Sequence, residues 1–303
     1  MIELARGSVE TWECDQMGHM NVQFYVEKAD EALAALAATI GLGPKALAAQ
    51  GLVLEATDHH VRFLRELRPG AAYFLRGGFV DGESAALTAY VEMIQMASGD
   101  ASASFRIVAS LKSAATREAR AVPEGVRKAA ATHRIAIPAH GKPRGLTLDA
   151  PRAAPTLDEA NGMGLLRTYQ GQAKPHECDA HGYWQTRFFM GRVSNAIPNL
   201  IVQSSGHDRA QGGLRGGAAL EYRFIYRRIP RAGDVLAIRS GLRSVGEKTY
   251  IWGHWMFDVE TGEAVATSEA VAIALDLATR KAIPLDPGQR AHLERLIVPG
   301  LAV

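Results

Sequence analysis

The sequence predicts an α+β fold made of two tandem copies of one unit, each an antiparallel sheet with one long helix packed on it. Three observations predict this fold. A loop motif recurs along the chain, a helix with one apolar face follows each copy of the motif, and several strand-like segments follow each helix. The length of 303 residues suits about two domains of roughly 150 residues each.

The repeat is centred on the two cysteines of the chain. Residues 13–21 read ECDQMGHMN and residues 177–185 read ECDAHGYWQ, so that Glu, Cys, Asp and Gly coincide at an offset of 177 − 13 = 164. The match continues in order downstream, as in RFL at 62–64 and RFI at 223–225. This pattern indicates the duplication of a whole domain, because solenoid repeats have periods of only about 20–50 residues.

In the first copy, a β-like segment at 3–12 leads into the motif, and the spacing of apolar residues predicts a helix over 22–40. Asn21 is a plausible N-cap and Gly41 a plausible stop for this helix. Turn signals then separate strand-like segments, and a short helix is expected near 124–133. The expected strands are 52–65, 72–80, 86–97 and 101–112.

The second copy follows the same order. A β-like segment at 165–173 precedes a helix over 186–204, in which Pro198 is expected to cause a kink or a break. A closing helix is expected near 287–297. The expected strands are 217–228, 234–243, 248–258 and 263–276.

These elements define three segments of the chain. The first domain is expected over 1–135 and the second over 165–303. Residues 136–164 are rich in Ala, Pro and Arg and are expected to form an extended linker.

Composition excludes several functional classes. Hydrophobic residues make up 47% and charged residues 22%, which is typical of a globular protein rather than a disordered one. A net charge of +2 argues against a dedicated nucleic-acid-binding protein. No apolar run reaches the ~18 residues of a membrane span, and the first residues lack the pattern of a signal peptide. With only two cysteines, a reducing, cytoplasmic location is expected.

The loop before each helix is the candidate site. Asp15 and Asp179 each lie just before a helix start. Amides at a helix start are unpaired and carry a partial positive charge, so they can hold an oxyanion, while a nearby carboxylate can act as nucleophile or general base. Acyl transfer needs both groups. The alternative is that both aspartates are ordinary turn or capping residues.

The first loop, followed by Phe24 and Tyr25, resembles the 4-hydroxybenzoyl-CoA thioesterase type of hotdog-fold acyl-CoA thioesterase. The second loop resembles it more loosely, and the resemblance covers about 1–112 and 165–276. It implies two hotdog domains, each a sheet wrapped round its helix, which pair as a pseudo-dimer. It also implies hydrolysis of an acyl-CoA or aryl-CoA thioester, with coenzyme A as part of the substrate and without a cofactor or metal.

Residue by residue, the resemblance implies that Asp15 is the catalytic carboxylate and that the amide of Val22 polarises the thioester carbonyl. Asn21 matches the asparagine of the family's loop. Asp179 and the amide of Thr186 are their counterparts in the second copy. That copy departs from the pattern, because Tyr183 replaces His19 and Gln185 replaces Asn21. We therefore expect the Asp15 site to carry most of the activity.

Other residues are candidates for contacts with the substrate. His19 is expected to steer the carboxylate or contact substrate, with a structural loop histidine as the alternative. Arg62 and Arg223 are candidates for the phosphates of coenzyme A, with solvated strand ends as the alternative. The remaining candidate contacts with the substrate are Gly18, Tyr25, His181 and Gly182.

The expected partner is an acyl-CoA, with no nucleic acid and no membrane, and the chain is expected to form a homo-oligomer. Two other functions stay open. One is a non-catalytic module that binds acyl-CoA, which the divergent second loop favours. The other is a hotdog hydratase or dehydratase, which would need a differently placed Asp/His pair.

Overall fold

A computed structural model describes residues 1–81, 85–205, 215–276, 278–279 and 281–303 of the chain. The chain forms two compact units, Met1–Lys142 and Pro143–Val303, called here the first and the second unit. In the described part of the chain, no helix is both long and apolar enough to cross a membrane.

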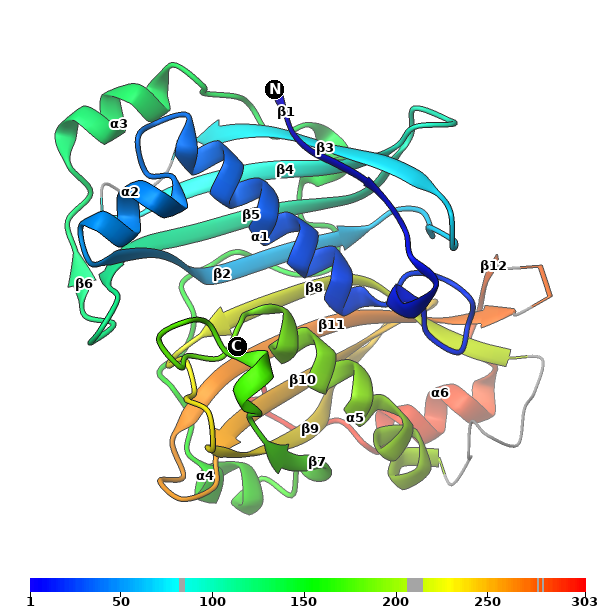
Figure 1. Ribbon diagram of the computed structural model, residues 1–303. Coiled ribbons are helices and arrows are strands. Elements are labelled where there is room, and N and C mark those ends of the chain that lie inside the picture. The colour runs from blue at the N-terminus through cyan, green and yellow to red at the C-terminus, as the bar shows by residue number, and fades with distance from the viewer. Residues whose placement is uncertain (82–84, 206–214, 277, 280) are drawn as a thin grey trace. The chain divides into compact units, whose positions relative to one another are not determined.

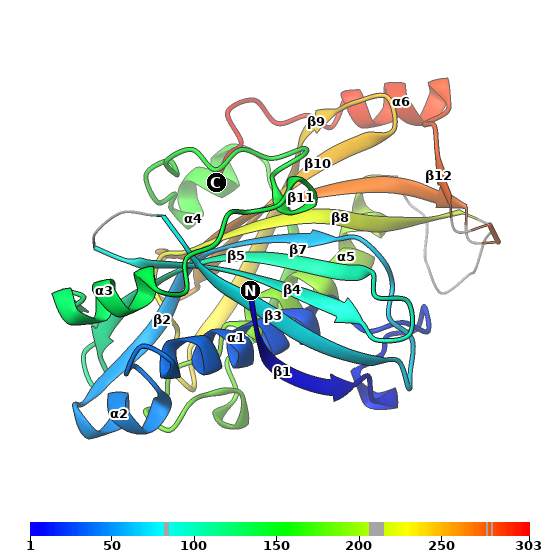
Figure 2. The same cartoon turned by 90° about the horizontal axis from the view of Figure 1, so that it is seen from above.

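The first unit is an antiparallel sheet in the order β1-β3-β4-β5-β2, with the short β6 paired to β5. Helix α1 crosses one face of this sheet (Figures 1 and 2). The expected strands are confirmed, and β3 begins and ends at the predicted residues. The elements are β1(Ile2–Ser8), α1(Val22–Ala38), α2(Pro44–Ala49), β2(Leu52–Phe63), β3(Ala72–Val80), β4(Leu87–Gln95), β5(Ala101–Ser113), β6(Ala119–Arg120) and α3(Glu124–Ala131).

The sequence explains where α1 begins and ends. The side chain of Asn21 caps the helix by accepting a hydrogen bond from the N–H of Gln23 (3.1 Å). At the other end, Gly41 adopts a φ of +83°, a conformation that favours glycine, and the chain turns away from the helix. The buried residues recur every three or four positions and form the core with the inner face of the sheet. They are Tyr25, Val26, Ala29, Ala32, Leu33, Leu36 and Ala37.

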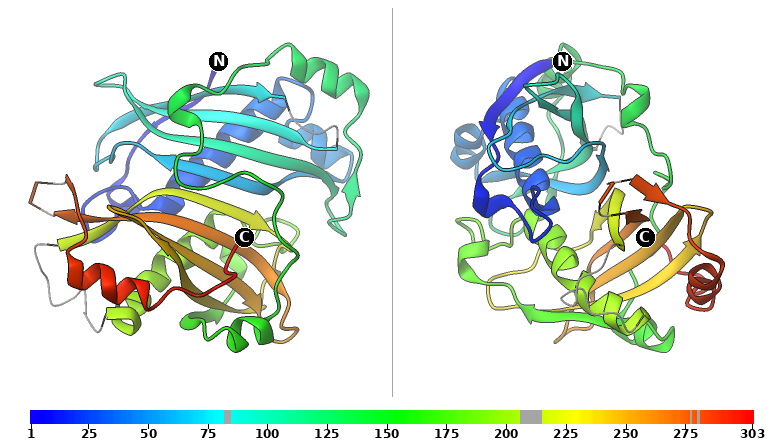
Figure 3. Two further views of the ribbon diagram at one scale, coloured as in Figure 1. Left: turned by 180° about the vertical axis from the view of Figure 1, so that it is seen from behind. Right: turned by 90° about the vertical axis from the view of Figure 1, so that its right-hand side faces the viewer.

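The second unit repeats this architecture, with the strand order β8-β11-β10-β9-β7 and the short β12 paired to β11. Figures 1 and 3 view the chain from opposite sides and show α5 on one face of this sheet. The elements are α4(Leu157–Gly162), β7(Leu166–Gln172), α5(Arg187–Ser205), β8(Arg215–Tyr226), β9(Val235–Val245), β10(Thr249–Asp258), β11(Ala264–Asp276), β12(Lys281–Ile283) and α6(Pro287–Glu294).

Helix α5 differs from the sequence prediction at one point. It runs through Pro198 to Ser205, so of the kink or break expected at this proline the break does not occur, while the kink stays a prediction. A proline removes one backbone hydrogen bond from a helix. Just beyond it, Leu200 is buried against Leu242 and Trp252 of the sheet, and this tertiary packing holds the last turns in place.

The segment that the sequence predicts as an extended linker is anchored by side chains of the strands. In the first unit, the guanidinium of Arg62 donates to the carbonyl oxygens of His140 (3.2 Å) and Lys142 (2.7 Å). In the second unit, Arg223 donates to the carbonyl oxygens of Thr147 (3.1 Å) and Asp149 (2.8 Å). The segment also contains α4. It is therefore held down by specific contacts over much of its length.

Candidate functional site

The first loop is closed by its own backbone. The N–H of Asp15 donates to the carbonyl oxygen of His19 (3.0 Å), and the N–H of Gly18 donates to the carbonyl oxygen of Asp15 (3.0 Å). Gly18 has a φ of +74°, which residues with a β-carbon rarely adopt. One carboxylate oxygen of Asp15 accepts from the N–H of Met17 (2.8 Å). These bonds fix the position of the Asp15 side chain, which is 19% exposed.

His19 lies between two carboxylates. Its Nδ1 is 3.8 Å from an oxygen of Asp15, and its Nε2 is 3.5 Å from an oxygen of Glu66. Glu66 follows β2 and is 47 residues beyond His19 in the sequence, so the sequence analysis missed it. The only available signal was an acidic residue among arginines in the run RFLRELRPG, which is equally typical of a solvated strand end. Glu66 therefore holds the imidazole ring of His19 beside the carboxylate of Asp15.

The start of α1 supplies the second chemical group of the site. The backbone N–H of Asn21 is used inside the loop, where it donates to the carbonyl oxygen of Glu13 (2.8 Å). Val22 is the first residue of α1, so the helix provides no acceptor for its N–H. The loop therefore carries a fixed carboxylate at one end and a helix-start amide at the other.

Tyr25 joins the segment after β2, which bears Glu66, to α1. Its hydroxyl oxygen accepts from the N–H of Leu67 (3.2 Å), and its ring packs edge-on against Phe63 with the ring centroids 5.3 Å apart. Burial raises the pKa of the Tyr25 hydroxyl, so this group stays neutral. The structure thus gives Tyr25 a positioning function, and its contact with substrate stays a prediction.

The second loop has the same backbone geometry as the first. The N–H of Asp179 donates to the carbonyl oxygen of Tyr183 (2.7 Å), and the N–H of Gly182 donates to that of Asp179 (3.0 Å). Gly182 has a φ of +79°. The N–H of Gln185 donates to the carbonyl oxygen of Glu177 (3.0 Å), as Asn21 does to Glu13. The duplication therefore preserves the loop bond for bond.

A buried glutamate anchors each loop to the helix that follows it. Glu13 pairs with Lys28 (3.3 Å) and Glu177 pairs with Arg192, two cations that are also 192 − 28 = 164 residues apart. Glu177 also accepts from the indole N–H of Trp184 (2.9 Å). Burial by itself would raise the pKa of Glu177, but these bonds and one from the N–H of Lys174 outweigh it and lower the pKa. Both glutamates belong to the repeated motif, but the sequence analysis gave them no function.

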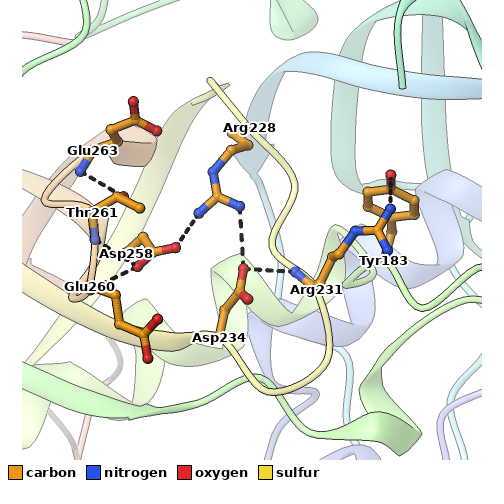
Figure 4. A network of polar contacts seen from close by, with 8 residues as sticks. All are labelled: Tyr183, Arg228, Arg231, Asp234, Asp258, Glu260, Thr261 and Glu263. Carbon is orange, nitrogen blue, oxygen red and sulfur yellow. Dashed lines mark hydrogen bonds and ion pairs between the residues drawn. The ribbon is translucent and has the colours of Figure 1, made fainter. Parts of the chain in front are cut away.

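The chemistry of the second loop differs from that of the first. Tyr183 occupies the position of His19, and its hydroxyl accepts from Arg231 (2.6 Å), whose guanidinium also lies 4.4 Å from the centre of the ring. Figure 4 shows this pair beside the ion pair between Arg228 and Asp234. One oxygen of Asp179 accepts from two backbone amides, those of His181 (2.8 Å) and Tyr183 (3.0 Å).

Two further predicted residues of the second loop are also placed. Thr186 directly precedes Arg187, the first residue of α5, so it lies one position earlier relative to its helix than Val22 does. His181 is exposed, and with the offset of 164 it matches Met17 of the first loop rather than His19. The second loop thus keeps its carboxylate but has a phenol where the first has an imidazole.

The two cysteines of the loops are poor nucleophiles. Burial, followed by the negative charges of Asp15 and Glu13, raises the pKa of the Cys14 thiol. The pKa of Cys178 is raised in the same way, by burial and then by Asp179 and other carboxylates. A thiol must lose its proton to attack a carbonyl, so these raised pKa values favour the aspartates as the reactive groups.

Arg62 lies on β2 and Arg223 lies on β8. Arg223 is only 3% exposed, and both guanidinium groups donate to backbone carbonyls of the segment 140–149. The structure therefore gives both residues an anchoring function. Their contact with the phosphates of a substrate stays a prediction.

The family model described as the thioesterase-like superfamily matches residues 9–130 and 173–293, one match in each unit. A search of curated protein sequences finds no match.

Solved structures of similar fold cover most of the chain. An acyl-ACP thioesterase from Bacteroides thetaiotaomicron is 12% identical with a TM-score of 0.65, over 88% of this chain and 96% of that one. A 12:0-ACP thioesterase from Umbellularia californica is 13% identical with a TM-score of 0.66, over 89% and 92%. At such low identity the likeness is one of fold, and it confirms the expected tandem hotdog domains.

Proposed function

Since the chain belongs to the thioesterase-like superfamily, we propose that its first loop hydrolyses the thioester bond of an acyl-CoA. The observation that carries the proposal is the line of Asp15, His19 and Glu66 beside the start of α1. This arrangement provides a carboxylate of fixed position and, seven residues further along the same loop, a helix-start amide for which the helix has no acceptor; these are the two groups that acyl transfer requires.

In the proposed reaction, the carbonyl oxygen of the thioester accepts a hydrogen bond from the N–H of Val22. Asp15 takes a proton from a water molecule, and the water oxygen adds to the carbonyl carbon. The C–S bond then breaks, which releases the fatty or aromatic acid, and the leaving thiolate takes the proton back from Asp15 to give free coenzyme A. Direct attack by Asp15 would instead give an anhydride that water then hydrolyses. His19, held by Glu66, positions the carboxylate in both versions.

The choice of coenzyme A as carrier rests on the resemblance of the first loop to 4-hydroxybenzoyl-CoA thioesterases. An acyl carrier protein is the alternative carrier, since two proteins of similar fold act on acyl-ACP according to their names. Matched thioesters of the same acyl group on both carriers separate the two. We expect free thiol to be released from the coenzyme A thioester, and a reaction confined to the carrier protein would correct the substrate class.

One observation supports a hydratase or dehydratase as the second candidate. Such enzymes need an acid and a histidine placed together, and Nε2 of His59 on β2 is 3.3 Å from an oxygen of Asp30 on α1. The His59 side chain is fully buried. Incubation of an enoyl-CoA with the protein tests this function, because hydration consumes the double bond and releases no thiol. Loss of the double bond without thiol release would replace hydrolysis by hydration.

The same assay distinguishes the enzyme from a non-catalytic binding module. A panel of aliphatic and aromatic acyl-CoA thioesters is incubated with the wild type and with Asp15→Asn, and free thiol is measured. Turnover that disappears in the variant supports the proposal. Binding of the thioesters without turnover in the wild type would make the chain a binding module.

A further inference from the structure

A layer of polar side chains crosses the interior of the second unit. Strand register places Ser240, His254 and Ser268 side by side on β9, β10 and β11. Thr168 of β7 extends the layer, with its hydroxyl oxygen 2.8 Å from that of Ser240. All four residues are at most 2% exposed.

This layer faces α5. Side chains two residues apart on a strand point to the same face of the sheet. Leu242 and Trp252 lie two positions from Ser240 and His254, and both pack against Leu200 of α5. The polar layer therefore lies between the sheet and the helix, where a hotdog unit has its core.

The corresponding layer of the first unit is apolar. Gly77, Val91 and Phe105 lie in register on β3, β4 and β5, and Val91 and Phe105 are fully buried. The offset is the same for each pair, since 240 − 77 = 254 − 91 = 268 − 105 = 163. The fold therefore forms without polar residues at these positions, and their presence in the second unit requires another explanation.

The polar layer is incompletely satisfied by the protein. Nδ1 of His254 is hydrogen-bonded to the hydroxyl of Ser240 (2.9 Å), and Ser268 donates to the carbonyl oxygen of His254 (3.3 Å). Among the residues that the structure describes, Nε2 of His254 has no hydrogen-bond partner, although it is buried. Leaving such an atom unpaired in a core is costly, so a bound group that pairs with it would be stabilised.

We propose that the interior of the second unit binds an apolar ligand that carries one neutral oxygen group, which pairs with Nε2 of His254. The ligand class is an oxygenated fatty acyl chain or the corresponding fatty acid, with a hydroxyl or a carbonyl on the chain. This site is independent of the hydrolysis proposed at Asp15.

The surroundings define the chemistry of the ligand. Beside the layer, Leu242 and Trp252 of the sheet pack with Ile197 and Leu200 of α5, and these apolar side chains suit a hydrocarbon chain. Burial lowers the pKa of His254, so its ring is neutral at physiological pH. A neutral ring pairs with either a hydroxyl or a carbonyl, because Nε2 donates in one tautomer and accepts in the other. A charged group would find no counter-charge on this layer, so only the oxygen group on the chain, and not the carboxylate of a fatty acid, pairs with Nε2.

The test compares dodecanoic acid with its chain-hydroxylated derivatives by isothermal titration calorimetry. We expect at least one hydroxy acid to bind the wild type about tenfold more tightly than dodecanoic acid, the value of one good hydrogen bond. The variant His254→Val installs the residue of the matching position 91 and should lose this preference while it stays folded. His176→Val, which replaces an exposed histidine, is the matched control and should keep it.

Nitrogen-15 NMR of the wild-type histidines gives a readout that needs no variant. The Nε2 resonance of His254 should shift when the preferred hydroxy acid is added, and not when dodecanoic acid is added. The proposal is overturned if no hydroxy acid is preferred, if His254→Val keeps the preference, or if the Nε2 resonance is unchanged on saturation with ligand. The last result would assign the polar layer to an internal water molecule.

Discussion

The buried His254 makes the stability of the second unit dependent on pH. Burial lowers its pKa from 6.5 to about 3, whereas the unfolded chain has the ordinary value. Between these two values the unfolded chain binds a proton that the folded chain does not. The stabilising effect is therefore complete above pH 6.5 and decreases as the pH falls below it, by about 1.4 kcal/mol per pH unit. From pH 7.5 to pH 5 this histidine should lower the free energy of unfolding by about 2 kcal/mol.

Urea unfolding followed by tryptophan fluorescence measures this effect. Trp184, Trp252 and Trp255 are buried in the second unit, while Trp12 of the first unit is 74% exposed, so the signal reports mainly on the second unit. Wild type and His254→Val are compared at pH 7.5 and pH 5. We expect the wild type to lose about 2 kcal/mol more than the variant. Equal losses in the two proteins would show that His254 is not held neutral, and would refute the reasoning.

Three further predictions concern the loops and the anchored segment. Because the pKa of Glu177 is lowered, its stabilising effect is present above pH 4.5 and is lost as the pH falls below that value. Glu177→Gln should therefore lower the free energy of unfolding by roughly 1–3 kcal/mol at pH 7 but have little effect near pH 3. Thermal melting at the two pH values measures this difference. His19→Asn should lower kcat by at least about tenfold, because Asp15 loses the imidazole ring beside its carboxylate. Tyr183→Phe, at the matching position of the second loop, should leave kcat within about twofold of the wild type. Equal effects of the two variants on thiol release would contradict the difference between the loops. Arg62→Ala should speed tryptic cleavage after Arg144, because two carbonyl contacts that hold this segment are removed. Unchanged cleavage with a raised KM would instead assign Arg62 to the substrate.

The sequence predicts much of the fold because its strongest signals are local. The apolar spacing of α1, its cap at Asn21 and the strand pattern of β3 depend on neighbouring residues, and the structure confirms them. The repeat predicts the backbone geometry of the loops as well as the order of the elements, because residues 164 apart make the same backbone hydrogen bonds in both loops.

The features that the sequence could not predict depend on contacts over long separations. Glu66 lies 47 residues beyond His19 and reaches it from the segment after β2, which the hydrogen bond between Leu67 and Tyr25 joins to α1. The segment 136–164 has the composition of a linker, but Arg62 and Arg223 on distant strands donate to its carbonyl oxygens. Pro198 is a helix-breaking signal that the packing of α5 overrides. In each case, tertiary contacts outweigh the local preference of the chain.

The assignment of the reaction to the first loop is tested most directly by comparing Asp15→Asn with Asp179→Asn on one acyl-CoA thioester. Asparagine keeps the oxygen that accepts from Met17 or His181, so each loop should retain its shape while its carboxylate charge is lost. Circular dichroism checks the fold of both variants. We predict that Asp15→Asn lowers kcat by at least about 100-fold, while Asp179→Asn lowers it less than about threefold. A larger loss from Asp179→Asn, or about half the activity left in each variant, would contradict this assignment.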